Sequence, residues 1–296
     1  MTTCNVEIVQ AFISKEGGGN PAGIVIEADS LSKHQRQKIA ATVGLSETAF
    51  LSKSSHANYK VEFFTPTKQI PLCGHATVGA FGLLQQRGML KGDNFKMETL
   101  AGIIPVYSDS GAMFMEQKAP VYTALTETEI ELAVRAIRST PAQLLKGFEP
   151  LIVDTGGPFL VIGVRDPIQL MKLVPDLKEI AEISSHFDLV GFYLFATQAQ
   201  SKEHDATARM FAPNFGIKEE SATGMAAGPL GCVLHDKLGI KKDRLVIEQG
   251  YLMKPPSPSH LEVRLQIANG SQSDTAVSSL RVGGRSAVVR TQQVEI

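Results

Sequence analysis

The chain has 296 residues and three cysteines, and its 29 lysines and arginines are balanced by 30 aspartates and glutamates. This balance leaves no charge excess to attract nucleic acid or anionic lipid, so neither is an expected partner. Cys4, Cys73 and Cys232 cannot form an even disulfide framework, and their spacing matches no metal-binding signature. We therefore expect a cytoplasmic protein with no metal site.

Targeting and membrane segments are not expected either. The first residues lack a basic region followed by an apolar run, and no stretch approaches the roughly 18 apolar residues of a membrane span. The Asn269-Gly270-Ser271 glycosylation sequon is expected to stay unmodified, because N-glycosylation needs a secretory route.

The first 120 residues predict strands that alternate with two helices. Ser30 or Ser32 is expected to cap a helix that runs to Val43 and stops at Gly44. Glu47 follows in the segment 45–51, at the mouth of a strand. The remaining periodic segments are predicted strands at 6–12, 22–26 and 59–64, and a hairpin formed by 97–107 and 112–116.

The second part of the chain is also predicted to combine strands with helices. A predicted division near Ala119-Pro120 gives domains 1–120 and 121–296. The last strand is allowed to return to the first domain. Thr126 with Glu129 predicts a capping box for a helix over 126–139. Further predictions are a helix at 177–184 and strands at 151–154, 159–164, 190–197, 207–211, 245–249, 261–267 and 279–283.

A helix of small and apolar residues follows Cys73-Gly74-His75 and has no polar face, which predicts burial on every side. Gly79 and Gly82 each lower helix propensity by roughly 1 kcal/mol relative to alanine, so packing must hold this helix. The pattern recurs. Phe64-Thr65-Pro66 precedes the first helix, and Phe211-Ala212-Pro213 precedes a second at 221–234.

One register of this repeat, that is, one alignment of its two copies, places Ser221 opposite Cys73 and Thr223 opposite His75. A shift of this alignment by one residue is the alternative. The repeat predicts an α+β fold of two pseudo-symmetric domains, each a mostly antiparallel sheet curled around a central helix. The two helix N-termini, at Gly74 and Gly224, are then expected at the domain seam. Their backbone N–H groups and dipoles favour an anion such as a carboxylate. Tight turns without a ligand are the alternative.

Three residues are candidates for chemistry. Glu47 stands among apolar neighbours, and burial disfavours the charged form of a carboxyl group, as a general acid requires; a half-exposed strand end is the alternative. His75 either contacts substrate or is an interior histidine. Cys73, at a helix N-terminus, suggests a racemase or epimerase that uses two thiols, but the repeat supplies Ser221, a much weaker base. Cys232 is expected in the core.

Several motifs together resemble the PhzF-like (phenazine biosynthesis) isomerase family over nearly the whole chain. They are Asn20-Pro21-Ala22-Gly23, Leu45-Ser46-Glu47-Thr48-Ala49-Phe50, Pro71-Leu72-Cys73-Gly74-His75-Ala76-Thr77 and Glu219-Glu220-Ser221-Ala222-Thr223-Gly224, with the two Phe-x-Pro segments. The resemblance implies the diaminopimelate epimerase fold, a homodimer, and proton transfer between ring carbons of a dihydro-hydroxyanthranilate without cofactor or metal.

The resemblance also implies site residues. Glu47 is the proton-shuttling acid/base, and the expected substrate contacts are Asn20, Cys73, Gly74, His75, Glu220, Ser221, Ala222, Thr223 and Gly224. The family pattern usually has Asp, Pro and Ser where this chain has Glu220, Ser221 and Met225. Lys254 stands where relatives tend to carry arginine. Arginine binds a carboxylate through two parallel hydrogen bonds, whereas lysine offers a point charge.

The sequence as a whole predicts a cofactor-independent isomerase that acts on a small carboxylate-bearing molecule. Two alternatives stay open at this point. One is an amino-acid racemase or epimerase that depends on Cys73. The other is a protein with the same fold that binds a metabolite or partner without catalysis.

Overall fold

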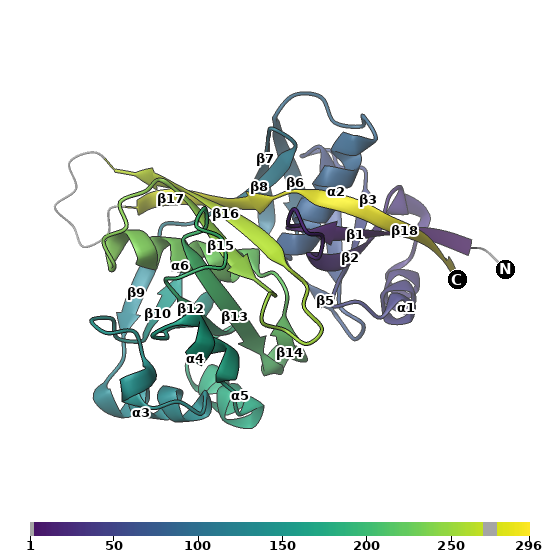
Figure 1. The fold of residues 1–296 in the computed structure, drawn as a ribbon. Helices are drawn as coiled ribbons and strands as arrows, with labels where there is room; N and C mark the ends of the chain where they lie inside the picture. The colour runs from purple at the N-terminus through teal and green to yellow at the C-terminus, as the bar shows by residue number, and fades with distance from the viewer. Residues whose placement is uncertain (1–2, 269–276) are drawn as a thin grey trace. The chain divides into compact units, whose positions relative to one another are not determined.

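The computed structural model describes residues 3–268 and 277–296, so the Asn269-Gly270-Ser271 sequon lies outside it (Figure 1). The chain forms two compact units. Unit 1 comprises Met1–Glu116 and Gly283–Ile296, and unit 2 comprises Gln117–Val282. The chain thus crosses between units after Glu116 and again after Val282, whereas the sequence analysis divided it at residue 120.

Unit 1 is built from short strands and two α-helices. Its helices are α1 (Lys33–Val43) and α2 (Gly74–Gln86), with a short 3-10 turn, η1 (Ala28–Ser30). Its strands are β1 (Thr3–Ala11), β2 (Asn20–Val25), β3 (Thr48–Ser52), β4 (Tyr59–Phe64), β5 (Gln69–Ile70), β6 (Asn94–Thr99), β7 (Gly102–Asp109), β8 (Ala112–Gln117) and β18 (Ser286–Glu295). Strand β18 runs antiparallel beside β1, from Thr3 against Glu295 to Ala11 against Ser286 (Figure 1).

Unit 2 contains more helices than unit 1 within the described residues. These are α3 (Glu127–Ala136), α4 (Pro167–Lys172), α5 (Leu177–His186) and α6 (Gly224–Asp236), with 3-10 turns η2 (Pro141–Gln143) and η3 (Pro213–Phe215). The strands are β9 (Val121–Ala124), β10 (Leu151–Asp154), β11 (Pro158–Gly163), β12 (Gly191–Ala196), β13 (Ala206–Ala212), β14 (Ile217–Glu220), β15 (Arg244–Gln249), β16 (Ser259–Ile267) and β17 (Val277–Gly284).

The same pairing order occurs in both units. In unit 1, β1–β2 is antiparallel, β2–β3 parallel, β3–β4 and β4–β5 antiparallel, β4–β6 parallel and β6–β7 antiparallel. Unit 2 repeats these six relationships with β10 to β16. Helices α2 and α6 occupy the same position in this order, after β5 and β14. The predicted α+β class and the internal repeat are confirmed.

Helix α2 is held by packing, as its glycines predicted. Every residue from Gly74 to Leu84 is buried, and the helix packs against β1, β2 and β18. A Cβ atom added at Gly82 would lie 2.0 Å from Oγ of Ser286 in β18. Glycine therefore permits the close approach of helix and strand, which offsets its low helix propensity.

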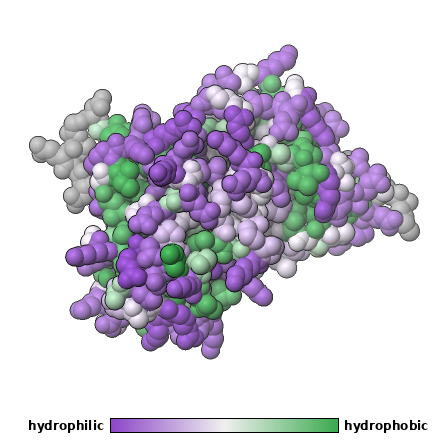
Figure 2. Space-filling model, in the orientation of Figure 1, coloured by the Kyte–Doolittle hydropathy of each residue, from purple (hydrophilic) through white to green (hydrophobic). Residues whose placement is uncertain are grey.

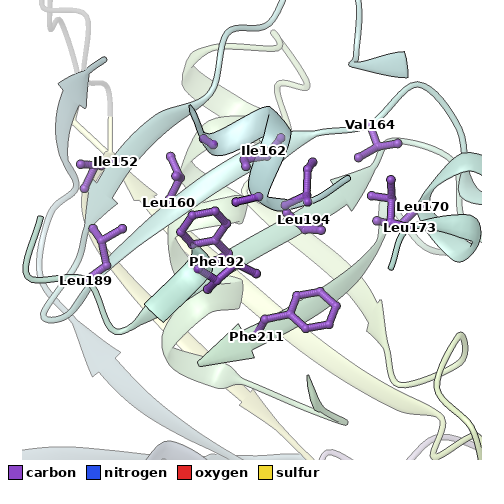
Figure 3. Packing of buried hydrophobic residues seen from close by; sticks show 14 of the residues in the cluster. Ile152, Leu160, Ile162, Val164, Leu170, Leu173, Leu189, Phe192, Leu194 and Phe211 are labelled. Carbon is purple, nitrogen blue, oxygen red and sulfur yellow. The ribbon is translucent and has the colours of Figure 1, made fainter. Parts of the chain in front are cut away.

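Each unit has an apolar core between its sheet and its outer helices. In unit 2, side chains of β11, β12 and β13 meet those of α3, α4 and α5, and Figure 3 shows Leu160, Ile162, Phe192 and Leu194 in this cluster. In unit 1 the corresponding cluster lies under α1. Its members are Val6, Ile8, Val25, Ala28, Ile39, Ala40, Phe50, Phe64 and Val294. The rings of Phe50 and Phe64 meet edge to face, with centroids 5.4 Å apart.

Helix ends follow the predicted capping chemistry. Ser32, not Ser30, caps α1 through a capping box with Gln35, and Gly44 ends the helix with φ of 69°. Thr126 and Glu129 form the predicted box of α3. That helix ends at Ala136 and not at 139, because Arg138 adopts a φ of 53°.

Three sequence predictions about elements were wrong or incomplete. The proposed strand 97–107 is two strands, β6 and β7, separated by a turn that enters β7 at Gly102 with φ of 106°. Helix α4 was missed because its six residues are too short for a periodic pattern. Strands β9 and β18 were also not identified.

The face in Figure 2 carries hydrophilic side chains over most of its area, with apolar residues in separate patches. Exposed large apolar side chains include Leu100, Val121, Ile168 and Val174. Within the described residues, no helix combines the length and the apolar character needed to cross a bilayer. The homodimer expected from the resemblance stays a prediction.

Candidate functional site

Glu47 lies at the start of β3, in the short segment that connects it to α1. The backbone carbonyl of Glu47 accepts a hydrogen bond from the N–H of Gly23 at 3.1 Å, which begins the parallel pairing of β2 and β3. Only 6% of the residue is exposed. The carboxylate therefore sits at a fixed point of unit 1, as a buried side chain and not as the half-exposed strand end that the sequence also allowed.

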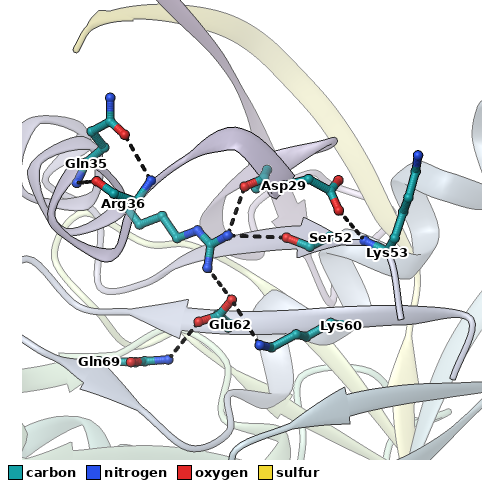
Figure 4. Close-up of polar contacts among 10 residues, drawn as sticks. Asp29, Gln35, Arg36, Ser52, Lys53, Lys60, Glu62 and Gln69 are labelled. Carbon is teal, nitrogen blue, oxygen red and sulfur yellow. Dashed lines mark hydrogen bonds and ion pairs between the residues drawn. The ribbon is translucent and has the colours of Figure 1, made fainter. Parts of the chain in front are cut away.

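The helix before this segment is anchored by a polar network (Figure 4). Arg36 of α1 forms an ion pair with Glu62 of β4 and donates to the carbonyl of Ala28 at 2.8 Å. Gln69 of β5 donates to the other oxygen of Glu62 at 3.3 Å. Since Arg36 is 8% exposed, these contacts tie α1 to β4 from within and fix where the segment to Glu47 begins.

His75 and Cys73 are placed by the N-terminus of α2. Cys73 is the N-cap residue, in extended conformation, and its side chain caps no backbone N–H. Its carbonyl accepts from the hydroxyl of Thr77 at 2.7 Å and from the N–H of Thr77 at 3.1 Å. His75, the second residue of the helix, is 4% exposed. The turn and the first helical residues are thus rigidly held.

The three side chains converge. Nε2 of His75 lies 3.3 Å from Oε2 of Glu47 and 3.5 Å from Oγ of Ser46, while Nδ1 lies 3.5 Å from Sγ of Cys73. The contact with Glu47 is within ion-pair distance, and Oε2 has no hydrogen-bond partner. A buried carboxylate oxygen without such a partner is costly to fold, and such atoms are concentrated at functional sites.

This cluster can accept and return a proton, because a carboxylate, an imidazole and a thiol all change protonation state in catalysis. It also forms a set of potential metal ligands. One donor atom from each of Glu47, Cys73 and His75 lies within 4.8 Å of the others. The sequence predicted no metal site from cysteine spacing, and it did not reveal this set because Glu47 comes from a separate segment.

The second predicted turn forms its own network in unit 2. Glu220, the last residue of β14, accepts from the hydroxyl of Thr223 at 2.7 Å. The amide of Gln249 donates to the carbonyl of Glu220 at 2.8 Å and accepts from the N–H of Thr223 at 3.1 Å. Tyr193 donates its hydroxyl to Gln249 at 2.9 Å. Gln249 is fully buried and thus determines the shape of the turn.

Burial raises the pKa of Tyr193, and the Glu220 carboxylate raises it further. The phenol is thus held neutral, so it serves as a hydrogen-bond donor to Gln249. Tyr193 and Gln249 position the turn, and neither was a predicted site residue. The sequence signal for Tyr193 was a polar side chain within an otherwise apolar strand.

The helix starts correct the predicted register of the repeat. Helices α2 and α6 both begin directly after an N-cap residue, Cys73 in one and Thr223 in the other. Thr223 is therefore equivalent to Cys73, and Met225 to His75, two residues away from the predicted register. The hydroxyl that corresponds to the Cys73 thiol is hydrogen-bonded to Glu220, so it is not a base.

The remaining predicted residues are divided between the units. Asn20 opens β2 and is 4% exposed. Unit 1 thus holds Asn20, Glu47, Cys73, Gly74 and His75, and among these the structure brings Glu47, Cys73 and His75 together. Unit 2 holds Glu220, Ser221, Ala222, Thr223 and Gly224, all buried. Their roles in substrate binding stay predictions. Ser46, which contacts His75, was not predicted.

A separate cleft of about 960 Å³ lies in unit 2, lined by β9 and the segment 147–151. The hydroxyl of Tyr122 donates to Asp236 there at 2.9 Å, and Nζ of Lys237 lies 4.4 Å from the centre of the Tyr122 ring. These polar groups are engaged with one another, so the cleft offers less chemistry than the cluster at Glu47.

Comparison with known proteins shows the family of the chain. Residues 9–292 match the family described as phenazine biosynthesis-like protein. An uncharacterized isomerase of Clostridium acetobutylicum is 35% identical over 242 residues, which cover 79% of this chain and 80% of that protein. The trans-2,3-dihydro-3-hydroxyanthranilate isomerase of Pseudomonas chlororaphis is 31% identical over 232 residues, 75% of this chain and 77% of that protein.

A solved structure shows the same fold. The phenazine biosynthesis protein of the PhzF family from Bacillus anthracis superposes with a TM-score of 0.90 at 26% identity, and the match covers 100% of both chains. The fold predicted from the motifs is thereby confirmed over the whole length.

Proposed function

Because the chain belongs to the phenazine biosynthesis-like protein family and is an isomerase, we propose that it moves a proton between carbon atoms of a small carboxylate-bearing substrate. In this proposal Glu47 is the acid/base, and the reaction needs no cofactor. The family favours catalysis over the alternative of a binding protein, since the relatives of Clostridium acetobutylicum and Pseudomonas chlororaphis are named isomerases.

The observation that carries the proposal is the state of the Glu47 carboxylate. Its Oε2 atom is buried and has no hydrogen-bond partner. A general base must have an oxygen that no other donor occupies, within reach of the proton it abstracts. The side chain of Glu47 is 8% exposed, so the oxygen is shielded from bulk water.

The proton transfer balances without an oxidant or reductant. The ionised Glu47 takes the proton of an acidified C–H bond, and the electron pair of that bond is delocalised into the adjacent unsaturated system. The protonated Glu47 then returns the proton to a second carbon. His75, 3.3 Å from Oε2, holds the carboxyl group of Glu47 in place while it carries the proton, and Ser46 orients the imidazole ring.

The substrate class follows from the helix start and from a relative. The N-terminus of α2 presents backbone N–H groups beside His75, and such a terminus favours an anion. The Pseudomonas chlororaphis relative is named for an anthranilate, which is a ring carboxylate. A small carboxylate therefore fits both observations, and we assign its anchoring to Gly74 and His75.

A screen of carboxylated metabolites in heavy water tests the proposal. The wild-type protein is expected to exchange a carbon-bound proton of its substrate for deuterium, seen as a mass increase, and to isomerise that substrate. Glu47→Gln should lose both activities, because an amide neither takes nor returns the proton. Retention of full exchange by Glu47→Gln would contradict the assignment.

The matched control is Glu7→Gln. Glu7 is also buried in unit 1, but its carboxylate pairs with Arg87 and accepts from Thr291 at 2.8 Å. This variant removes a buried carboxylate outside the cluster, so it should keep the exchange activity. Exchange lost equally in both variants would point to a general loss of folding, which thermal unfolding of each protein detects.

A second candidate function rests on the thiol. Sγ of Cys73 lies 3.5 Å from Nδ1 of His75, a distance at which an imidazole assists a nucleophilic or basic thiolate. A Cys73-dependent racemase would lose activity in Cys73→Ser and after thiol alkylation. Activity that survives both treatments would leave Glu47 as the acid/base.

A further inference from the structure

We propose that the cleft beside β9 in unit 2 is a binding site for a free amino acid with a large apolar side chain. The cleft volume of about 960 Å³ lies in the range of small-molecule sites. Its walls include β9, the segment 147–151 and Lys237, the residue that follows α6. None of Glu47, Cys73 and His75 lines it. The site is therefore independent of the proposed isomerase reaction.

The wall formed by the segment 147–151 is fixed in place and partly apolar. Phe148 is 8% exposed, and its ring meets that of Phe195 edge to face with centroids 5.5 Å apart. A Cβ atom added at Gly163 would lie 2.9 Å from Cδ1 of Phe148, so glycine lets the segment rest directly on β11. The N–H of Leu145 donates to the carbonyl of Gly163 at 2.9 Å. This wall is thus preformed, and a ligand need not order it.

Tyr122 of β9 forms a second fixed surface of the cleft. Its hydroxyl donates to the carboxylate of Asp236 at 2.9 Å, and the same carboxylate lies 2.8 Å from Nδ1 of His235. The side chain of Asp236 is 1% exposed, so the contact that holds the phenol is shielded from solvent. The aromatic ring of Tyr122 is therefore held in one orientation.

Lys237 supplies an ammonium group that has no counter-ion. The residue is exposed, and Nζ lies over the Tyr122 ring, 4.4 Å from its centre, which keeps the group beside the cleft. Within the parts of the chain that the structure describes, no carboxylate forms an ion pair with Nζ and no oxygen accepts its hydrogen bonds. The group is therefore available to bind a ligand carboxylate through charge-assisted hydrogen bonds.

Glu149 supplies the opposite charge from the segment 147–151. This residue lines the same cleft and is exposed, and among the described residues it has no ion-pair or hydrogen-bond partner. Lys237 and Glu149 therefore do not neutralise each other. The cleft thus presents one cation and one anion separately, with the apolar surface of Phe148 and Tyr122 in the same cleft.

The two separate charges select the class of ligand. The α-carboxylate of a free amino acid pairs with Lys237, its α-ammonium group pairs with Glu149, and a large apolar side chain covers the apolar lining. An exposed ion pair alone contributes little, so a molecule that carries only one of the two charges should bind more weakly. Apolar contact adds affinity in proportion to the area buried, so glycine, which has no side chain, should also bind more weakly.

Isothermal titration of the full chain with L-phenylalanine tests the proposal. We expect one molecule per chain, with a dissociation constant in the millimolar range or below. The comparison ligands are 3-phenylpropanoate, which lacks the ammonium group, 2-phenylethylamine, which lacks the carboxylate, and glycine. Each should bind at least about fivefold more weakly. Absence of binding by L-phenylalanine, or equal binding by 3-phenylpropanoate, would overturn the proposal.

Variants assign the two charges to their residues. Lys237→Met keeps an apolar chain beside the Tyr122 ring but removes the ammonium group, so L-phenylalanine should bind at least about fivefold more weakly. Glu149→Gln should weaken L-phenylalanine by a similar factor and leave the binding of 3-phenylpropanoate unchanged. The controls Lys146→Met and Glu131→Gln remove exposed charges that do not line the cleft, and should leave binding unchanged. Unchanged binding in both Lys237→Met and Glu149→Gln would place the ligand elsewhere and overturn the proposal.

Discussion

The carboxylate of Glu47 lies 3.3 Å from Nε2 of His75, yet Oε2 of Glu47 takes part in no hydrogen bond. The buried carboxylate of Glu47 and the buried imidazole of His75 are thus in contact, but no hydrogen bond joins them. Such an arrangement costs folding free energy, because the desolvated oxygen gains no donor in return. A substrate that approaches Oε2 recovers this cost, and this is why the proposed function centres on that atom.

His75 is predicted to position and stabilise the Glu47 carboxylate. His75→Gln should lower kcat by about 100-fold, because a misplaced acid/base loses the geometry that proton transfer needs. KM should rise as well, since His75 is also assigned to the anchoring of the substrate carboxylate. Steady-state kinetics on the substrate found in heavy water measures both constants.

The control for this prediction is His34→Gln. His34 lies in the exposed first turn of α1, away from the cluster, and the substitution should leave kcat unchanged. If His75→Gln kept wild-type kcat, the imidazole would be a structural residue of the α2 N-terminus and not a part of the reaction.

Gln249 is predicted to hold the Glu220–Thr223 turn. Its side chain bonds the carbonyl of Glu220, the N–H and hydroxyl of Thr223, and the hydroxyl of Tyr193. Gln249→Leu leaves these buried groups unpaired, and each unpaired group costs about 1–3 kcal/mol. The free energy of unfolding should fall by at least 3 kcal/mol by this reckoning, measured by urea denaturation. Gln293→Leu, at an exposed position of β18, should change it little; similar losses in both variants would refute the role.

The sequence predicted those elements whose pattern is local. The Ser32 and Thr126 caps, the stop at Gly44 and the apolar α2 each rest on neighbouring residues, and the structure has them as expected. Helix α4 and strand β18 depend on distant partners. Strand β18 pairs with β1 from the other end of the chain, and no periodic pattern contains that information.

The candidate site likewise has features that the local sequence predicts and features that depend on distant residues. The motifs identified Glu47, Cys73 and His75, but not that Oε2 of Glu47 lacks a donor, since this depends on angles between two segments. The sequence also placed the two helix N-termini at Gly74 and Gly224, where the structure has them, but its alignment of Ser221 with Cys73 was misplaced by two residues.

Arg36 is predicted to stabilise unit 1. Arg36→Met removes the charge that pairs with Glu62 and leaves a largely buried carboxylate, with 13% of its side chain exposed. Breaking a buried ion pair on one side costs about 3–5 kcal/mol. Circular dichroism during urea unfolding should show a loss of about this size for the transition of unit 1. The double variant Arg36→Met, Glu62→Leu should recover part of it, and a double variant no better than the single one would argue against the ion pair as the cause.

Alkaline pH is predicted to destabilise unit 2 through two buried acids, Cys232 and Tyr193, and the half-buried Tyr122. Burial raises the pKa of Cys232, of Tyr193 and of Tyr122. In the unfolded chain a thiol ionises near pH 8.5 and a phenol near pH 10, about their ordinary values. The folded protein keeps these protons to higher pH, so the stability they contribute is complete below pH 8.5 and declines as the pH rises. The decline is about 1.4 kcal/mol per pH unit for each group that ionises only in the unfolded state.

Urea denaturation at a series of pH values from 7 to 11 measures this decline. The slope should increase near pH 8.5 through Cys232 and again near pH 10 through the two tyrosines. Tyr193→Phe removes one ionisable group, so its slope above pH 10 should be shallower than that of the wild-type protein by about 1.4 kcal/mol per pH unit. Tyr59→Phe is the control, because no comparable burial surrounds this half-buried strand residue of unit 1. Equal slopes for Tyr193→Phe and the wild-type protein would mean that the Tyr193 phenol ionises in the folded state, and the hydrogen bond to Gln249 would then not be the donor contact that shapes the turn.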